Sequence, residues 1–233
     1  MTLFSLARKP EPEVMDELDG VEAYASAAAQ AHLNTLDNTF VDQVVSLGVE
    51  EGMALDVGAG PGSIPLKIAR RCPRLRLVGA DRSAAMLHVA RAAAVQQGLG
   101  ARVEFLLADA SRLCFPDAAF DLVISNSLLH HLSEPVRTFD ELARVTRPGG
   151  KVLLRDLRRP SRLAFAFHAA WHGRHYSGRM KQLYEDSVRA AYTPAEIERL
   201  LRKSCMRSSR VIRTRRTHMG ILWENVTGNS RTA

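Results

Sequence analysis

Short apolar runs, each bounded by Gly, Asp or Pro, recur through the middle of the chain. Five such runs are Met53–Val57, Leu75–Ala80, Val103–Leu107, Leu122–Ser125 and Val152–Leu154. Their length and composition predict strands buried on both faces of a sheet. Three stretches between them repeat apolar residues at helical spacing: Ser63–Arg71, Ser83–Gln97 and Glu134–Thr146. Because parallel strands need helical crossovers, this alternation predicts an α/β fold with a doubly wound, Rossmann-like, mostly parallel sheet and helices on both faces.

The regions on either side of this core predict further helices. Val14–Leu47 has helical periodicity, so we treat residues 1–50 as an N-terminal helical arm or lid and residues 51–233 as one domain. After the fifth strand, residues 158–192 predict a helical insertion that we expect to act as a substrate lid.

The last part of the chain returns to the sheet. Thr193 and Glu196 have the spacing of a capping box, which predicts a helix that runs through Lys203. The pattern of Ser209–Trp223 then predicts a pair of strands.

Composition agrees with one ordinary globular domain. The chain has 233 residues, of which 46% are hydrophobic and 24% charged, enough for one sizeable core. No apolar run is long enough to span a bilayer, so we expect a cytoplasmic protein without a membrane partner. Cys72, Cys114 and Cys205 match no metal or disulfide spacing, so we expect reduced thiols.

The formal charge of +7 raises the question of a nucleic acid partner. Basic residues gather between Arg202 and Arg216, a stretch without any acid. Such a stretch could neutralise phosphates. A solvated basic face is the simpler interpretation, because the stretch offers no aromatic side chain on which bases could stack.

The strongest chemical signal is the run LDVGAGPGS at residues 55–63, where a predicted strand enters a predicted helix. Glycines let the backbone turn tightly and approach a ligand, and the helix start offers unpaired N–H groups. A purely structural turn or a dinucleotide site are the alternatives. Ser63 stands where the dinucleotide motif has its third glycine, which argues against a nicotinamide cofactor.

Two acids end neighbouring predicted strands. Asp81 follows the glycine turn at the distance where a carboxylate binds ribose hydroxyls in nucleotide cofactors; its alternative role is to cap the helix near Ser83. Asp109 ends the next strand, and its carboxylate can accept a hydrogen bond from an adenine amino group.

Four segments together resemble the class I S-adenosylmethionine-dependent methyltransferases, from about Met53 to Leu157. The segments are LDVGAGPG, VGADRS, LLADASRLCFPDAAFDLVISNSLLHHL and RPGGKVLLRDL. The resemblance implies a seven-stranded sheet with an antiparallel last strand, and S-adenosylmethionine as methyl donor with S-adenosylhomocysteine as product. It implies cofactor contacts for Asp56, Gly58, Ala59, Gly60, Gly62, Asp81, Arg82, Met86, Asp109, Ala110 and Asn126.

In similar sequences Asp81 lies on the ribose, Asp109 near the adenine amino group and the Asn126 turn near the reactive methyl. Asp121, before the fourth strand, takes a structural role. Tyr24 in the arm is a candidate lid contact to the cationic sulfur, with a packing role as the alternative.

Three residues are candidates for a catalytic base. His130 and His131 follow the fourth predicted strand, and Asp156 ends the fifth, so all three would lie near the transferred methyl group. A structural turn is the alternative for the histidines. In the insertion, His168, His172 and His175 would share a helical face, but no cysteine or nearby acid supports a metal there, and we assign none.

The sequence therefore predicts an S-adenosylmethionine-dependent methyltransferase with a small-molecule acceptor. An RNA methyltransferase and a regulatory protein that binds S-adenosylmethionine without turnover are the alternatives. A nicotinamide-dependent oxidoreductase would share the fold, but this sequence lacks an obvious Tyr–Lys or similar proton-transfer pair for that reaction. The sequence leaves the acceptor and the oligomeric state open.

Overall fold

A seven-stranded sheet forms the centre of the molecule. The computed structural model describes residues 6–11, 27–214 and 217–226. Its strands are β1 (Glu51–Val57), β2 (Arg74–Asp81), β3 (Val103–Leu107), β4 (Phe120–Asn126), β5 (Thr146–Leu157), β6 (Arg210–Thr214) and β7 (His218–Glu224). They lie in the order β3-β2-β1-β4-β5-β7-β6, and β7 runs opposite to the other six strands. This arrangement confirms the doubly wound sheet and its antiparallel last strand.

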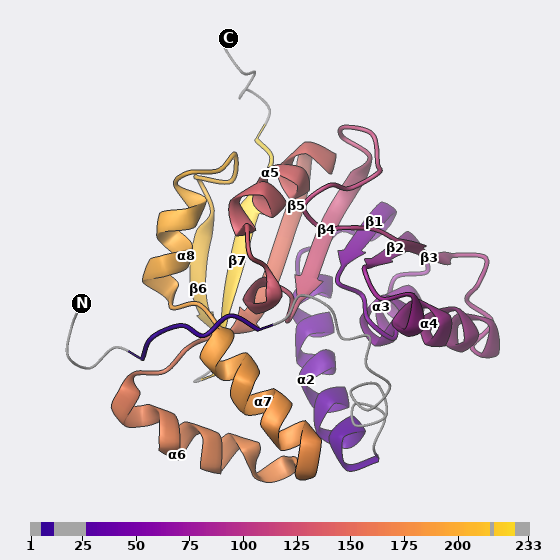
Figure 1. The fold of residues 1–233 in the computed structure, drawn as a ribbon. Coiled ribbons are helices and arrows are strands. Elements are labelled where there is room, and N and C mark those ends of the chain that lie inside the picture. Colours follow the sequence, from indigo (N-terminus) through magenta and orange to yellow (C-terminus); the bar gives the residue numbers. More distant parts are fainter. Residues whose placement is uncertain (1–5, 12–26, 215–216, 227–233) are drawn as a thin grey trace.

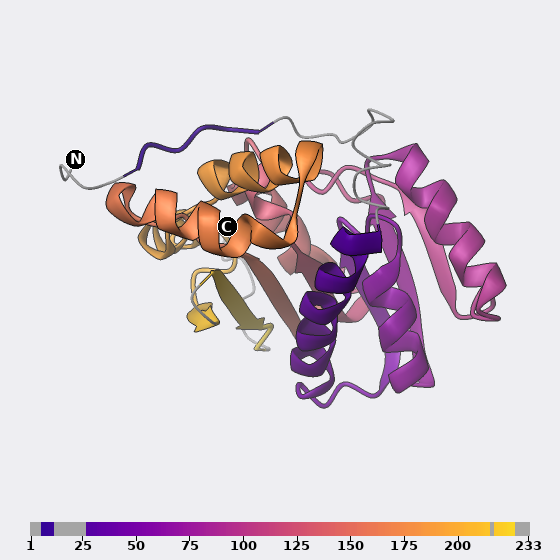
Figure 2. The same cartoon turned by 90° about the horizontal axis from the view of Figure 1, so that it is seen from below.

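Helices cover both faces of the sheet (Figures 1 and 2). The α-helices of the described residues are α2 (Ala27–Val45), α3 (Ser63–Arg71), α4 (Ala84–Gln96), α5 (Pro135–Val145), α6 (Arg162–His172), α7 (Gly178–Ala190) and α8 (Pro194–Leu201). One core packs α2, α3 and α4 against the sheet, and a second core packs α5 and α8 against its other face. Both faces are therefore buried, as a parallel sheet requires.

Helices α6 and α7 lie beyond the carboxyl ends of the strands, below the arrowheads of β4 and β5 in Figure 1. Their apolar contacts form two small clusters outside the main cores, one around Tyr176 and Met180 and one around Leu157 and Val188. The short 3₁₀ helices Leu129–His131 and Gly173–His175 lie on the same side as α7, which packs against both of them. This end of the sheet is where open α/β folds bind ligands.

Most helix ends follow the local sequence. Ser83 is the N-cap of α4 and accepts a hydrogen bond from the Met86 N–H, so the helix begins at Ala84. The capping box of α8 forms between Thr193 and Glu196 as expected, although this helix ends at Leu201 rather than at Lys203.

The fifth strand is longer than its apolar run predicted. It starts at Thr146, where the preceding helix ends, and continues to Leu157. The apolar run missed its first residues, because Pro148 and the pair Gly149–Gly150 are typical of turns. Near its end, Arg155 and Asp156 are polar yet only 5% and 1% exposed. Their burial is compensated by hydrogen bonds that belong to the site described below.

The chain before the sheet was only partly predictable. Helix α2 lies within the expected arm, whereas residues 12–26, which include part of that arm and Tyr24, lie outside the described residues. Residues 6–11 form an extended segment at the upper edge of Figure 2, where Lys9 bonds to the end of α7 and Arg8 to the turn that follows β4. None of the described helices is both long and apolar enough to cross a membrane.

Candidate active site

A cavity of about 520 Å³ opens at the carboxyl ends of the strands. Its volume falls in the range of small-molecule sites. The cavity wall includes ten of the residues that the sequence singled out: Gly58, Gly60, Asp81, Arg82, Met86, Asp109, Ala110, Asn126, His130 and His131. Asp56, Ala59, Gly62 and Asp156 lie beside it without forming its wall.

The glycine turn between β1 and α3 serves two purposes. Gly60 has a φ of 53°, and a Cβ built on it would meet nothing within 4 Å, so its backbone faces open space. Gly62 has a φ of 81°, and a Cβ there would come within 2.7 Å of the Phe105 ring. Because Gly62 has no side chain, the turn can pack closely against the Phe105 ring, which is the role that the third glycine has in the dinucleotide motif. Gly60 instead leaves room for a ligand.

Asp81 connects this turn to the end of β2. Its carboxylate accepts hydrogen bonds from the backbone N–H of Gly60 at 2.7 Å and of Ser83 at 2.8 Å. The capping role considered for Asp81 belongs instead to Ser83. Asp81 therefore organises the glycine turn and also borders the cavity.

Asp109 borders the same end of the cavity. Its carboxylate accepts hydrogen bonds from the backbone and the hydroxyl of Ser111, at 2.8 and 2.7 Å. These hydrogen bonds hold the pKa of Asp109 below its usual value, so it is an ionised acceptor at neutral pH. On the opposite side of β1, Asn126 accepts a hydrogen bond from Arg155 Nε at 2.7 Å, which fixes its amide.

Asp56 is a buried carboxylate that lacks a partner. It is 1% exposed, and neither of its oxygens has a hydrogen-bond partner among the described residues. Burial, followed by the nearby charges of Asp81 and Asp37, raises its pKa well above the usual value. An orphaned acid directly before the glycine turn fits a ligand that brings a cationic group, such as the amino group of S-adenosylmethionine.

A histidine–carboxylate pair lies at the other end of the cavity. His130 Nδ1 and Asp156 Oδ1 are 2.6 Å apart, and the two side chains are 3% and 1% exposed. Asp156 Oδ2 also accepts the backbone N–H of Leu129, so this carboxylate fixes the turn that carries His130. The sequence placed these residues near each other, and the structure brings His130 and Asp156 into direct contact.

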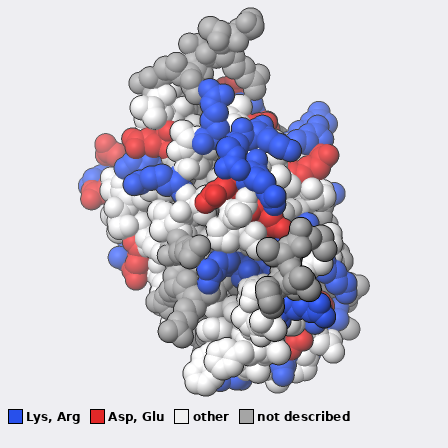
Figure 3. Space-filling view, turned by 90° about the vertical axis from the view of Figure 1, so that its left-hand side faces the viewer, with Lys and Arg blue, Asp and Glu red and all other residues white. Residues whose placement is uncertain are grey.

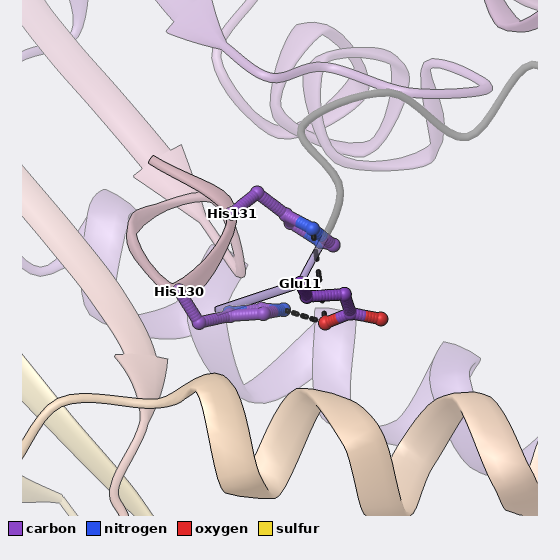
Figure 4. Close-up of side chains that lie close together, drawn as sticks. All are labelled: Glu11, His130 and His131. Atoms are coloured by element: carbon purple, nitrogen blue, oxygen red, sulfur yellow. Dashed lines mark ion pairs between the residues drawn. The ribbon is translucent and has the colours of Figure 1, made fainter. Parts of the chain in front are cut away.

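Glu11 completes the cluster and was not predicted. Its Oε2 lies 4.0 Å from His130 Nε2 and 3.8 Å from His131 Nδ1, with the three side chains converging as shown in Figure 4. Nothing in its surroundings in the sequence marks Glu11, because it lies about 120 positions from the histidines in a short extended segment. A contact of this kind has no periodic signal.

The charges of the cluster are mutually dependent. Burial opposes protonation of His130, but the charge and hydrogen bond of Asp156, helped by Glu11, outweigh it and raise the pKa of His130. Burial likewise disfavours the charged form of Asp156, yet His130 holds its pKa below the usual value. Burial raises the pKa of Glu11. His130 is thus a stronger base than a free imidazole.

Arg8 fixes the segment that carries Glu11. Its guanidinium donates to the carbonyl oxygen of His130 at 2.9 Å and of Ala190 at 2.6 Å, and lies 4.1 Å from the centre of the Tyr192 ring. Glu11, His130 and His131 offer ligand atoms within 4.8 Å of one another, a spacing that could hold a metal ion. The Arg8 charge beside them opposes a further cation.

The insertion contributes apolar and aromatic residues to the wall, namely Tyr176, Met180, Leu183 and Tyr184. His168 Nε2 and the Tyr184 hydroxyl are 3.2 Å apart. Burial, then the charges of His172 and Arg158, lower the pKa of His168 to about 4. His168 is therefore neutral at physiological pH. The side chain of His175 lies outside the described residues.

Comparison with known proteins agrees with this geometry. Residues 55–154 match the family model described as a methyltransferase domain. A demethylmenaquinone methyltransferase from Thermus thermophilus is 36% identical over 125 residues, which are 53% of this chain and 56% of that protein. One from Deinococcus radiodurans is 30% identical over 170 residues, 66% of this chain and 67% of that protein. The chain spans about half the length of the first of these relatives.

The fold is also found among solved structures. The plantazolicin methyltransferase BpumL, in complex with a pentazolic desmethylPZN analog and SAH, superimposes with a TM-score of 0.68 at 13% identity, covering 90% of this chain and 92% of that one. Sequence, fold and site geometry agree, and the chain belongs to the class I S-adenosylmethionine-dependent methyltransferases.

Proposed function

We propose that this chain transfers a methyl group from S-adenosylmethionine to a small, largely apolar acceptor. The observation that carries the proposal is the continuity of one cavity, from the glycine turn and Asp81 at one end to His130 at the other. Such a cavity can hold donor and acceptor together, and alignment of the two is the main requirement of an in-line methyl transfer.

The end with the glycine turn is suited to S-adenosylmethionine, which supplies an electrophilic methyl group on a sulfonium when bound. Asp81 uses one hydrogen bond per oxygen and retains acceptor capacity for ribose hydroxyls. Asp109 remains ionised and can accept from the adenine amino group. Asp56 lies behind the cavity wall, and a cationic amino group bound nearby would favour its ionised form. The other proposed contacts are Gly58, Ala59, Gly60, Gly62, Arg82, Met86, Ala110 and Asn126.

The histidine end is suited to remove a proton from the acceptor. With Nδ1 bound to Asp156, a neutral His130 has its basic lone pair on Nε2, the atom nearest to Glu11. The raised pKa of His130 makes it a stronger proton acceptor than a free imidazole. Glu11 and His131 would share the proton, and Asp156 is a positioning residue.

We assign the cluster to proton transfer rather than to a metal ion because of Arg8. Its guanidinium is hydrogen-bonded to the His130 carbonyl, and its positive charge partly opposes the rise in the pKa of His130 that Asp156 and Glu11 cause. A divalent cation among Glu11, His130 and His131 would be repelled by that charge.

The α7 side of the cavity favours an apolar, aromatic-sized acceptor. Tyr176 and Tyr184 lie with ring centres 5.3 Å apart, and Met180 and Leu183 add flexible and aliphatic surface. Two relatives are named as demethylmenaquinone methyltransferases, so a quinol of that class is the first acceptor to test.

The test is a transfer assay with S-adenosylmethionine labelled on its methyl group and a reduced demethylmenaquinone analogue with a short side chain. Label should pass to the organic product with the wild type and fall about a hundredfold with His130→Gln. Transfer to total RNA but not to this or any other small hydroxylated aromatic acceptor would overturn the proposed acceptor class. Binding of S-adenosylmethionine without any transfer would overturn the assignment as an enzyme.

A further inference from the structure

Helix α6 presents an apolar face to solvent. Leu163, Phe167 and Trp171 are 75%, 68% and 54% exposed. Spaced four residues apart, they lie along one side of the helix, and the rings of Phe167 and Trp171 stack with their centres 6.0 Å apart. Single exposed apolar residues are ordinary, but a contiguous stripe of three large ones indicates a surface that is covered in the functional state.

Basic residues lie before, within and after α6 in the sequence. Between Asp156 and Glu185 the sequence contains six Arg and Lys residues and no acid: Arg158, Arg159, Arg162, Arg174, Arg179 and Lys181. All except Arg158 and Arg159 are exposed. The Arg174 guanidinium lies 4.3 Å from the centre of the Trp171 ring. Figure 3 shows the lower part of this side of the molecule as largely white, with scattered blue and a little red.

We propose that α6 docks on an anionic lipid surface. Aromatic and leucine side chains on one face, with arginine and lysine at its margins, form the combination by which amphipathic helices bind in the plane of a bilayer. Tryptophan favours the interface between headgroups and acyl chains. The absence of acids from the surrounding sequence makes the patch complementary to anionic headgroups.

The docking face adjoins the cavity. His172 at the end of α6 and Tyr176 just beyond it form part of the cavity wall. A protein held on the bilayer through α6 would therefore have its acceptor site close to the lipid. This departs from our expectation of no membrane partner, which was based on the lack of a spanning segment and does not apply to a helix lying on the surface. The docking proposal is independent of the proposed reaction.

The test is sedimentation of the full chain with vesicles of phosphatidylcholine alone or mixed with phosphatidylglycerol. We expect binding about tenfold stronger to the anionic vesicles, and its loss at about 0.5 M salt. The double variant Phe167→Ser, Trp171→Ser should weaken binding about tenfold. Val95→Ser is the matched control, because Val95 is 74% exposed on α4, away from α6. Unchanged thermal unfolding verifies that each variant is folded.

Tryptophan fluorescence gives a second, independent measurement of vesicle binding. The chain has two tryptophans, and Trp223 is only 8% exposed, so a blue shift on addition of vesicles would report Trp171. A folded wild type that does not bind anionic vesicles, or a double variant that binds as well as wild type, would overturn the proposal. A dimer that the double variant abolishes, with no vesicle binding, would assign the face to a second copy of the chain.

Discussion

At the scale of single residues, the Asp81 side chain has both a structural contact and a proposed cofactor contact. Its carboxylate both organises the glycine turn and borders the cavity. We expect Asp81→Asn to weaken S-adenosylmethionine binding more than tenfold, because an amide accepts fewer and weaker hydrogen bonds from ribose. Calorimetry measures this, with Glu50→Gln, an exposed acid paired to Arg74, as the control. Unchanged affinity in folded Asp81→Asn would exclude Asp81 from the site.

The His130–Asp156 pair predicts opposite pH trends for activity and stability. The raised pKa of His130 means that protonation stabilises the folded state, so this contribution is complete below about pH 6.5 and is lost as the pH rises through the raised value. Activity should rise over the same range as Nε2 loses its proton. Unfolding and rate profiles between about pH 6 and 9 measure both.

Asp156→Asn should lower the pKa of His130 and move the activity profile to lower pH, with a lower maximal rate. His88→Gln, a histidine on the exposed side of α4, is the control and should leave both profiles unchanged. Wild-type activity that is flat across the His130 titration would contradict a role as base.

At the scale of elements, residues 6–11 bring a segment from early in the chain to the histidine end of the cavity. Arg8 anchors them through carbonyl oxygens of two distant elements and through the Tyr192 ring. Arg8→Ala should lower the free energy of unfolding by about 1 to 3 kcal/mol, because the Arg8 guanidinium is the charged donor to these carbonyl oxygens. It should also slow transfer by displacing Glu11.

Lys9→Ala is the matched control for Arg8→Ala. Lys9 is exposed, and only its backbone N–H bonds the segment, to the Arg189 carbonyl, so its side chain should be dispensable. Denaturant unfolding and the transfer assay measure both variants. Equal stability and activity in the two variants would show that the segment does not support the site.

The elements also show how far the sequence was informative. The apolar runs predicted the first five strands and the Thr193 capping box predicted α8, because these signals are local. The glycine turn and the acids at strand ends predicted much of the cavity wall for the same reason. The Glu11 contact could not be predicted, because it joins segments far apart in the chain without a repeating pattern. The start of β5 at Thr146 could not be predicted, because Pro148 and the pair Gly149–Gly150 are residues typical of turns rather than strands.

At the scale of the whole molecule, the charge of the chain is spread unevenly. Figure 3 shows Lys and Arg gathered on the upper part of one side, over α8 and β6. Arg202, Lys203, Arg207 and Arg210 are exposed there, and none of them borders the cavity. This separation favours a small-molecule acceptor over RNA, although the basic surface itself stays without an assigned partner.

The assignment of the Glu11 cluster to proton transfer predicts that the enzyme works without a divalent metal. Treatment with a strong chelator, followed by removal of the chelator, should leave the rate of methyl transfer unchanged. Metal content of the purified protein gives an independent measurement. Activity that is lost with the chelator and restored by one divalent ion would assign the cluster to a metal instead.

The most direct test of the whole account is calorimetric titration of the purified chain with S-adenosylmethionine, with S-adenosylhomocysteine and with NADH. The account predicts micromolar binding of the first two, weakened in Asp81→Asn, and no binding of NADH. Binding of NADH, or of none of the three by a folded protein, would contradict the cofactor assignment on which every proposed role in the cavity depends.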